Sequence, residues 1–199
     1  MRHLIAHRGL DNHKYKENSI NGILNSLSKD YINGVEIDIR FTKDKKIVMY
    51  HNMISNFKII SNANYNELSN IDLFENLLKK IKSNKIILLD IKCENNKYEV
   101  FIEYLLKLID KYPLNYYLCS FNYKLIKYII GKTKYPLGIF ITDIINKNKD
   151  YSKLSFLALS KNSYNDIKFN TKFVWTINTN KNINKYKYII TDKAQLLSK

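Results

Sequence analysis

The chain has 199 residues, 45% of them hydrophobic, with only five Gly and two Pro, a composition that excludes a disordered or fibrous chain. Its net charge of +15 is compatible with an anionic partner, but the basic residues are spread along the chain. They form no stripe on one predicted helix, so the sequence does not favour a nucleic-acid partner.

No apolar run approaches the roughly 20 residues of a membrane-spanning helix, and no charged segment followed by a long apolar run opens the chain. The two cysteines, Cys93 and Cys119, have no metal-binding spacing and lie in or beside apolar runs. We therefore expect a soluble, cytoplasmic protein with free, buried thiols.

Short apolar runs alternate with amphipathic segments along the chain. The predicted strands lie at residues 3–6, 35–41, 47–50, 85–92, 116–121, 137–141, 155–160, 173–178 and 188–191. The predicted helices lie at residues 20–27, 71–81, 98–112 and 125–130. Asn18 or Ser19 can cap the first helix.

Eight of these strands, all except 47–50, would be joined by crossover connections, which predicts an α/β fold of the (β/α)8 TIM barrel type. At 199 residues the barrel would be compact, so some helices must be short or missing. We expect a single domain over residues 1–199, with a short variable insert near residues 52–70 that is rich in Asn and Ser.

Glu36 and Asp38 stand two residues apart in a predicted strand, so both side chains project from the same face of the sheet. Buried side by side, two carboxylates repel each other and favour a cation between them. The alternative is an edge strand whose acids lie in water.

The predicted barrel places many polar residues together, because the carboxyl ends of parallel strands meet at one end of such a barrel, where active sites lie. The polar residues at these strand ends are His7, Arg8, Glu36, Asp38, His51, Asp90, Lys92, Ser120 and Asn178. Their convergence favours a buried metal and phosphate site over the edge-strand alternative. His3 and His13 have no such support, and we expect them to be structural or exposed.

At these positions the sequence resembles the glycerophosphodiester phosphodiesterase family, part of the phosphatidylinositol phospholipase C-like phosphodiesterase superfamily. The blocks that carry the resemblance are His7-Arg8-Gly9, Glu17-Asn18-Ser19, Glu36-Ile37-Asp38, Thr42-Lys43-Asp44 and Ile47-Val48-Met49-Tyr50-His51-Asn52. Weaker blocks follow at residues 88–92, 119–121, 174–178 and 189–197. The family usually has Glu in place of Asp90 and Asp in place of Asn52, and its insert after the histidine is longer.

The resemblance implies a metal-dependent hydrolase that cleaves small-molecule glycerophosphodiesters to glycerol 3-phosphate and an alcohol. Glu36, Asp38 and Asp90 offer only oxygen ligands, which suits Mg²⁺ or Ca²⁺. His7 would act as general base and His51 as general acid, although the sequence does not decide which is which. The phosphate and substrate contacts would come from Arg8, Lys92, Glu17 and Trp175.

Two alternatives stay open. The chain could act like a phospholipase D on lysophospholipid or sphingomyelin, because its basic surface would favour peripheral contact with anionic lipid. It could instead be a catalytically degenerate barrel that binds anions or nucleic acid, with Asn52 and Asp90 as signs of lost activity. We expect Asp192, near the last strand, to cap a helix.

Overall fold

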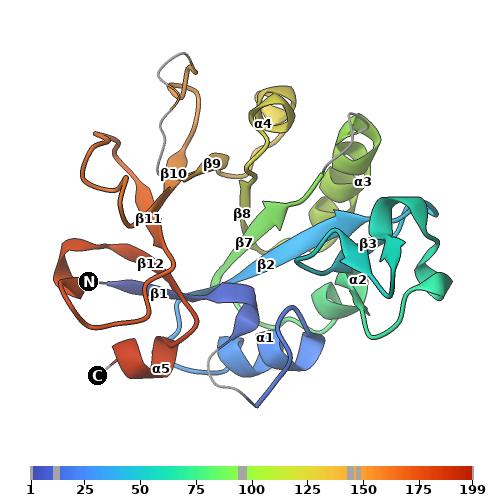
Figure 1. The fold of residues 1–199 in the computed structure, drawn as a ribbon, viewed down its shortest axis with the longest axis horizontal. Helices are drawn as coiled ribbons and strands as arrows, with labels where there is room; N and C mark the ends of the chain where they lie inside the picture. The colour runs from blue at the N-terminus through green and yellow to red at the C-terminus, as the bar shows by residue number, and fades with distance from the viewer. Residues whose placement is uncertain (1, 11–13, 94–97, 143–145, 147–148, 199) are drawn as a thin grey trace.

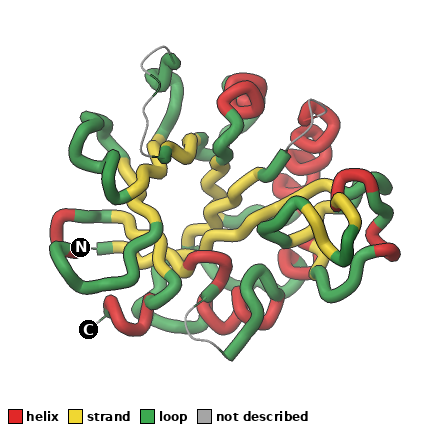
Figure 2. The backbone as a smooth tube through the Cα atoms, in the orientation of Figure 1, coloured by secondary structure: helices red, strands yellow, loops and turns green. Residues whose placement is uncertain are grey.

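The computed structural model describes residues 2–10, 14–93, 98–142, 146 and 149–198, so His13 lies outside the described part. Within it, eight parallel strands form one curled sheet, which confirms the predicted α/β character (Figures 1 and 2). In spatial order they are β1 (His3–Ala6), β2 (Gly34–Phe41), β7 (Ile86–Ile91), β8 (Asn115–Cys119), β9 (Gly138–Ile141), β10 (Phe156–Ser160), β11 (Lys172–Trp175) and β12 (Tyr188–Thr191).

The sheet curls so that its last strand, β12, pairs with its first, β1. Between β8 and β9 the described strands meet through one bridge, Leu118 to Leu137, with a backbone hydrogen bond on either side of it. All the other neighbours pair in parallel over two to six residues.

Helices lie around the outside of the sheet (Figure 1). They are α1 (Ile20–Leu27), α2 (Phe74–Leu78), α3 (Tyr98–Lys111), α4 (Tyr123–Ile129) and α5 (Ala194–Leu197). Ser19 caps α1 by accepting a hydrogen bond from the Gly22 amide at 3.1 Å, whereas Asn18 has another role. The predicted helix at residues 71–81 is shorter than expected, and the β10–β11 connection, residues 161–171, contains no helix.

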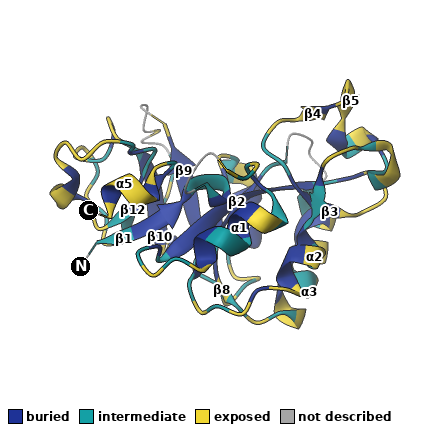
Figure 3. Cartoon of the chain, turned by 90° about the horizontal axis from the view of Figure 1, so that it is seen from below, coloured by how far each residue is buried: buried dark blue, intermediate teal, exposed yellow. Residues whose placement is uncertain are grey.

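The insert after His51 has more regular structure than its sequence indicated. β3 (Ile47–Met49) pairs antiparallel with β2 and with β6 (Asp72–Leu73). Between β3 and β6, the strands β4 (Ile54–Ser55) and β5 (Lys58–Ile59) form a hairpin that projects from the body of the molecule (Figure 3). The 3-10 turns η2 (Ile60–Asn62) and η3 (Tyr65–Glu67) follow it; η1 (His7–Gly9) and η4 (Ile183–Lys185) lie elsewhere.

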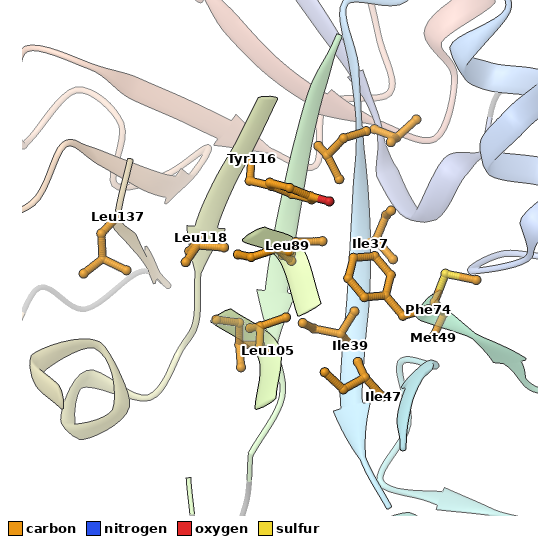
Figure 4. Packing of buried hydrophobic residues seen from close by; sticks show 14 of the residues in the cluster. Ile37, Ile39, Ile47, Met49, Phe74, Leu89, Leu105, Tyr116, Leu118 and Leu137 are labelled. Carbon is orange, nitrogen blue, oxygen red and sulfur yellow. The ribbon is translucent and has the colours of Figure 1, made fainter. Parts of the chain in front are cut away.

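Strand residues alternate between two apolar layers. Ile37 and Ile39 of β2 and Leu89 of β7 point outward, where they pack with Phe74 of α2 and Leu105 of α3 (Figure 4). The other face contributes an inner cluster. Its members are Ile5, Ile86, Leu88, Cys119, Phe140, Phe156, Ala158, Phe173 and Ile190. Residues at inward positions near the carboxyl ends of the strands therefore meet inside the curled sheet.

The structure confirms part of the expectation for the thiols. Cys93 and Cys119 are both free, but only Cys119 is buried, since Cys93 is half-exposed. No helix among the described residues combines the length and the apolar character that a membrane crossing requires.

Candidate active site

Three carboxylates from two adjacent strands lie together on the inner face of the curled sheet, near the carboxyl ends of its strands. Glu36 and Asp38 lie on β2, and Asp90 lies on β7 directly beside Asp38 in the strand register. All three are buried, and one oxygen of each lies within 4.8 Å of the others. The predicted convergence of these acids is therefore observed, and the edge-strand alternative is wrong because none of the three faces water.

Burial and mutual repulsion govern the charges of these acids. Burial, reinforced by the charge of Asp38, raises the pKa of Glu36 to about 8. Burial also raises the pKa of Asp90 to about 6, although Lys92 opposes the shift. Burial would raise the pKa of Asp38 as well, but Lys92, a hydrogen bond from Asn18 and Arg8 together lower it. Asp38 therefore stays ionised at lower pH than the other two acids.

The same three groups suit a hard divalent cation, because they present only oxygen ligands. Oδ1 of Asp90 is buried and accepts no hydrogen bond from the described residues. An oxygen of this kind is costly to bury unless a cation or a donor satisfies it. The donor set and this orphaned oxygen both fit Mg²⁺ or Ca²⁺.

Two cationic side chains lie against the acids. Nζ of Lys92 is 2.5 Å from Oδ2 of Asp90 and 3.1 Å from Oδ1 of Asp38. Nε of Arg8 is 3.3 Å from Oδ2 of Asp38, and Nη1 of Arg8 donates to Oε2 of Glu17 at 2.9 Å. Glu17 therefore orients Arg8.

Asn18 is a site residue that the sequence interpretation missed. Its amide nitrogen donates to Oδ2 of Asp38 at 2.8 Å, and its amide oxygen accepts from the Asp38 backbone at 3.0 Å. Asn18 has a φ of 51°, a left-handed conformation that Asn tolerates better than most residues. This conformation turns the side chain into the site. The Glu17-Asn18-Ser19 block could have indicated the role.

His7 is held by a chain of hydrogen bonds from the last strand. Nδ1 of His7 lies 2.6 Å from Oδ1 of Asp192, and Asn178 donates to the other oxygen of Asp192 at 2.7 Å. Burial would lower the pKa of His7, but Asp192 and Glu36 outweigh it and raise that pKa. The expectation that Asp192 caps a helix is wrong, because Lys193 occupies the cap position of α5 and the Asp192 carboxylate faces His7.

His51 lies beyond the acids, at the start of the insert. Its Nδ1 is 2.9 Å from Oδ1 of Asn52, so an amide occupies the position next to this ring. The buried Arg40 donates from Nε to the backbone oxygens of Tyr50 and His51, both at 3.1 Å. Arg40 thereby fastens the loop that carries His51 to strand β2.

A cavity of about 140 Å³ joins these groups. Its lining includes both histidines, the three acids, Arg8, Lys92 and Trp175. The indole of Trp175 donates to the Ala158 oxygen at 3.1 Å, which fixes the ring at the cavity wall. Ser120 and Asn178 do not line the cavity: Ser120 donates to the Ile91 oxygen, and Asn178 acts through Asp192. A larger cavity of about 580 Å³, lined in part by Arg40, shares Lys92 with it.

Solved structures share this fold along nearly the whole chain. A glycerophosphodiester phosphodiesterase from Parabacteroides distasonis superposes with a TM-score of 0.82 at 21% identity, covering 96% of this chain and 92% of that one. The corresponding enzyme from Thermotoga maritima gives 0.76 at 20% identity, with 98% and 96% covered. A putative one from Galdieria sulphuraria gives 0.78 at 15% identity, with 99% and 96% covered. These likenesses define a curled α/β fold shared with such phosphodiesterases.

Residues 7–104 match the model of the glycerophosphoryl diester phosphodiesterase family. This match confirms the resemblance seen in the sequence over about half of the chain. The matched segment contains Arg8, Glu17, the three acids, His51 and Lys92, whereas Asp192 lies outside it. No curated protein sequence gives a significant match.

The acids predict how the stability of the metal-free protein depends on pH. Glu36 and Asp90 have folded-state pKa values of about 8 and about 6 against ordinary values of 4.5 and 3.8, so the folded chain binds protons that the unfolded chain has released. The free energy of unfolding should therefore fall as the pH rises from the ordinary pKa values of these two acids to their folded-state values. The raised pKa of His7 acts in the same direction above pH 6.5.

Since a bound cation requires ionised carboxylates, the stabilisation by Mg²⁺ or Ca²⁺ should grow with pH. Thermal unfolding midpoints at pH 5 and pH 8, each with chelator and with cation, measure both effects. Glu36→Gln should flatten the pH dependence, while Asp110→Asn, at a fully exposed position, should not change it. An equal gain from cation at both pH values would contradict the assignment.

Proposed function

We propose that this chain hydrolyses glycerophosphodiesters to glycerol 3-phosphate and an alcohol, with Glu36, Asp38 and Asp90 holding Mg²⁺ or Ca²⁺. The observation that carries the proposal is the buried acid cluster in a cavity lined by two histidines, Arg8 and Lys92. The match of residues 7–104 to the family model supports the reaction type. The bound cation would neutralise the charge of the phosphate and lower the barrier to attack on phosphorus.

Arg8 and Lys92 would bind phosphate oxygens. Each already lies against an ionised carboxylate, so each is positioned without a large rearrangement. Arg8 presents a planar fork of donors and Lys92 a point charge, so the two can hold different phosphate oxygens. Glu17 and Asn18 position this pair through Arg8 and Asp38.

The two histidines would divide the proton transfers. With Nδ1 of His7 donating to Asp192, Nε2 is the nitrogen left to take a proton, and it lies 3.8 Å from Oε2 of Glu36. We assign the general base to His7 because a carboxylate stabilises its protonated form. His51 would then protonate the leaving alcohol. Trp175 would form the wall against which the glycerol part packs.

The proposal includes the architecture predicted at the outset, a single (β/α)8 barrel domain over residues 1–199. The β12–β1 pairing and the Leu118–Leu137 bridge support closure of the eight strands. The alcohol part of the substrate would extend toward the larger cavity, which Lys43, Lys45 and Ile60 help to line.

Turnover of soluble glycerophosphocholine tests the function. Release of glycerol 3-phosphate should be abolished by a chelator and restored by Mg²⁺ or Ca²⁺, since the acid cluster would lose its ion and the phosphate its counter-charge. Coupled detection of glycerol 3-phosphate gives the measurement. Undiminished activity in chelator would rule out the metal role, and no turnover of any diester would favour a degenerate barrel.

Replacement of either histidine should impair catalysis without unfolding the chain. His7→Ala and His51→Ala should each lower the maximal rate by about 10² or more, because one proton transfer loses its carrier. His3→Ala is the matched control, since His3 stacks on Tyr188 at 4.8 Å and does not line the cavity. A wild-type rate in either site variant would refute its assigned role.

Asn52 should set the pH range of activity. Asn52→Asp would place a carboxylate 2.9 Å from the position of Nδ1 of His51, which would stabilise the protonated ring. The basic limb of the rate profile should therefore move to higher pH, as measured by initial rates between pH 6 and 10. Asn66→Asp adds the same charge at an exposed position of the insert that lines neither cavity, and should leave the profile in place.

A further inference from the structure

The β4–β5 hairpin begins three residues after His51 and stands out from the rest of the molecule (Figure 3). Ile54 pairs with Ile59 and Ser55 with Lys58, which leaves Asn56 and Phe57 as a two-residue loop at the tip. The Ile60 amide donates to the Met53 oxygen at 3.0 Å and closes the base of the hairpin. A partner bound to this hairpin would therefore lie close to His51 of the candidate site.

The hairpin exposes apolar side chains at its tip and along its arms. Phe57 is fully exposed, at 104% of its reference area, and Ile54 is half-exposed. Met53 and Ile59 are each 40% exposed. Four large hydrophobic residues are thus exposed within seven positions. The other exposed large hydrophobic residues in the described part of the chain lie away from the hairpin, at Val100 and Tyr104 on α3, Phe121 and Leu196. A grouped apolar surface of this kind indicates a partner.

The conformation of the tip strengthens that indication. Asn56 and Phe57 both have positive φ, 48° and 61°, as a two-residue type I′ hairpin turn requires. Asn and Gly favour such positions, whereas a bulky aromatic residue is strained there. With its side chain wholly exposed, the Phe57 ring is not packed against any described residue in a way that would offset this strain. A contact from outside the chain would supply that stabilisation.

The charge around the hairpin identifies the class of partner. Residues 43–70 contain four lysines against two acids. The exposed turn at residues 43–46 is joined to the insert by hydrogen bonds from the Lys43 amide to the Ala63 oxygen and from the Tyr65 amide to Asp44. Lys58 lies beside Phe57 on the hairpin. An apolar tip next to lysines matches the apolar boundary and anionic head groups of a phospholipid bilayer.

We propose that the β4–β5 hairpin docks this protein on anionic phospholipid membranes, with the Phe57 ring at the boundary between head groups and acyl chains. Ile54 and Met53 would follow the ring into this boundary, and Lys43, Lys45 and Lys58 would face the head groups. Docking of this kind would hold the His51 end of the cavity against diesters at the membrane surface, such as lysophospholipids. Only this consequence for the substrate rests on the proposed phosphodiesterase function.

Co-sedimentation with vesicles tests the docking. Wild-type protein should bind vesicles of phosphatidylcholine with one third phosphatidylserine at least tenfold more tightly than vesicles of phosphatidylcholine alone, since each lysine near the surface contributes about fivefold. Phe57→Gly should weaken binding to the anionic vesicles about tenfold. It creates the Asn-Gly dipeptide that type I′ turns favour, so the hairpin should fold at least as well.

Leu196→Ala is the matched control, because it removes another half-exposed apolar side chain, on α5 at the other end of the molecule (Figure 3). Its binding to vesicles should equal that of the wild type. Phe57→Trp should bind like the wild type and should shift its emission to the blue on anionic vesicles. The wild-type spectrum, which comes from Trp175 alone, is the reference.

Three results would overturn the proposal. These are no binding of the wild type to anionic vesicles, equal binding of the wild type and Phe57→Gly, or equal binding to neutral and anionic vesicles. Concentration-dependent dimerisation that Phe57→Gly abolishes, without vesicle binding, would also overturn it and would assign the tip to a second copy of the chain.

Turnover separates this proposal from the proposed function. Phe57→Gly should cleave soluble glycerophosphocholine at the wild-type rate and should lose rate only on lysophospholipid presented in anionic vesicles. If no diester is cleaved but Phe57-dependent vesicle binding persists, the docking stands and the phosphodiesterase function fails. If soluble diester is cleaved and vesicle binding is absent, the phosphodiesterase function stands and the docking fails.

Discussion

The structure depends on keeping three carboxylates together out of water. Glu36, Asp38 and Asp90 are buried with oxygens within 4.8 Å of one another, an arrangement that repulsion alone would disperse. The chain balances it in two ways: Lys92 and Arg8 supply positive charge, and raised pKa values let Glu36 and Asp90 retain protons. A divalent cation would replace those protons, so the fold already places the three acids where the proposed ion would bind.

Neighbouring groups limit how this charge can be rearranged. Asn18 holds both the carboxylate and the backbone of Asp38, and Glu17 holds Arg8. Asp192 holds His7 from the opposite side. Asp38, Arg8 and His7 are therefore each oriented by a neighbouring residue that has no proposed contact with the phosphate. This arrangement lowers the reorganisation needed when an anionic substrate enters, which is the main electrostatic requirement for catalysis on a phosphodiester.

The sequence predicted the positions of the acids, because these follow from the alternation of side chains along a strand. Glu36 and Asp38 were expected on one face because side chains alternate along a strand, and Asp90 was expected beside them because parallel strands end together. Asp192 was misread, since its contact with His7 joins residues 185 positions apart and no local pattern reports it. Asn18 was interpreted as a cap because its left-handed backbone is not visible in the sequence. The hairpin at residues 54–59 was missed for the same reason, since its tip lacks the usual glycine.

The pairing of β12 with β1 places the partner of His7, Asp192, directly after the last strand of the sheet. The acid cluster, in contrast, is assembled from strands in the first half of the chain. A nascent or partly unfolded chain that has formed β1, β2 and β7 therefore contains every proposed ion ligand but lacks the group that orients its proposed base. The proposed ion site and the proposed base should thus form at different stages of folding, and local opening of the C-terminal strand would release His7 from Asp192 while leaving the three acids in place.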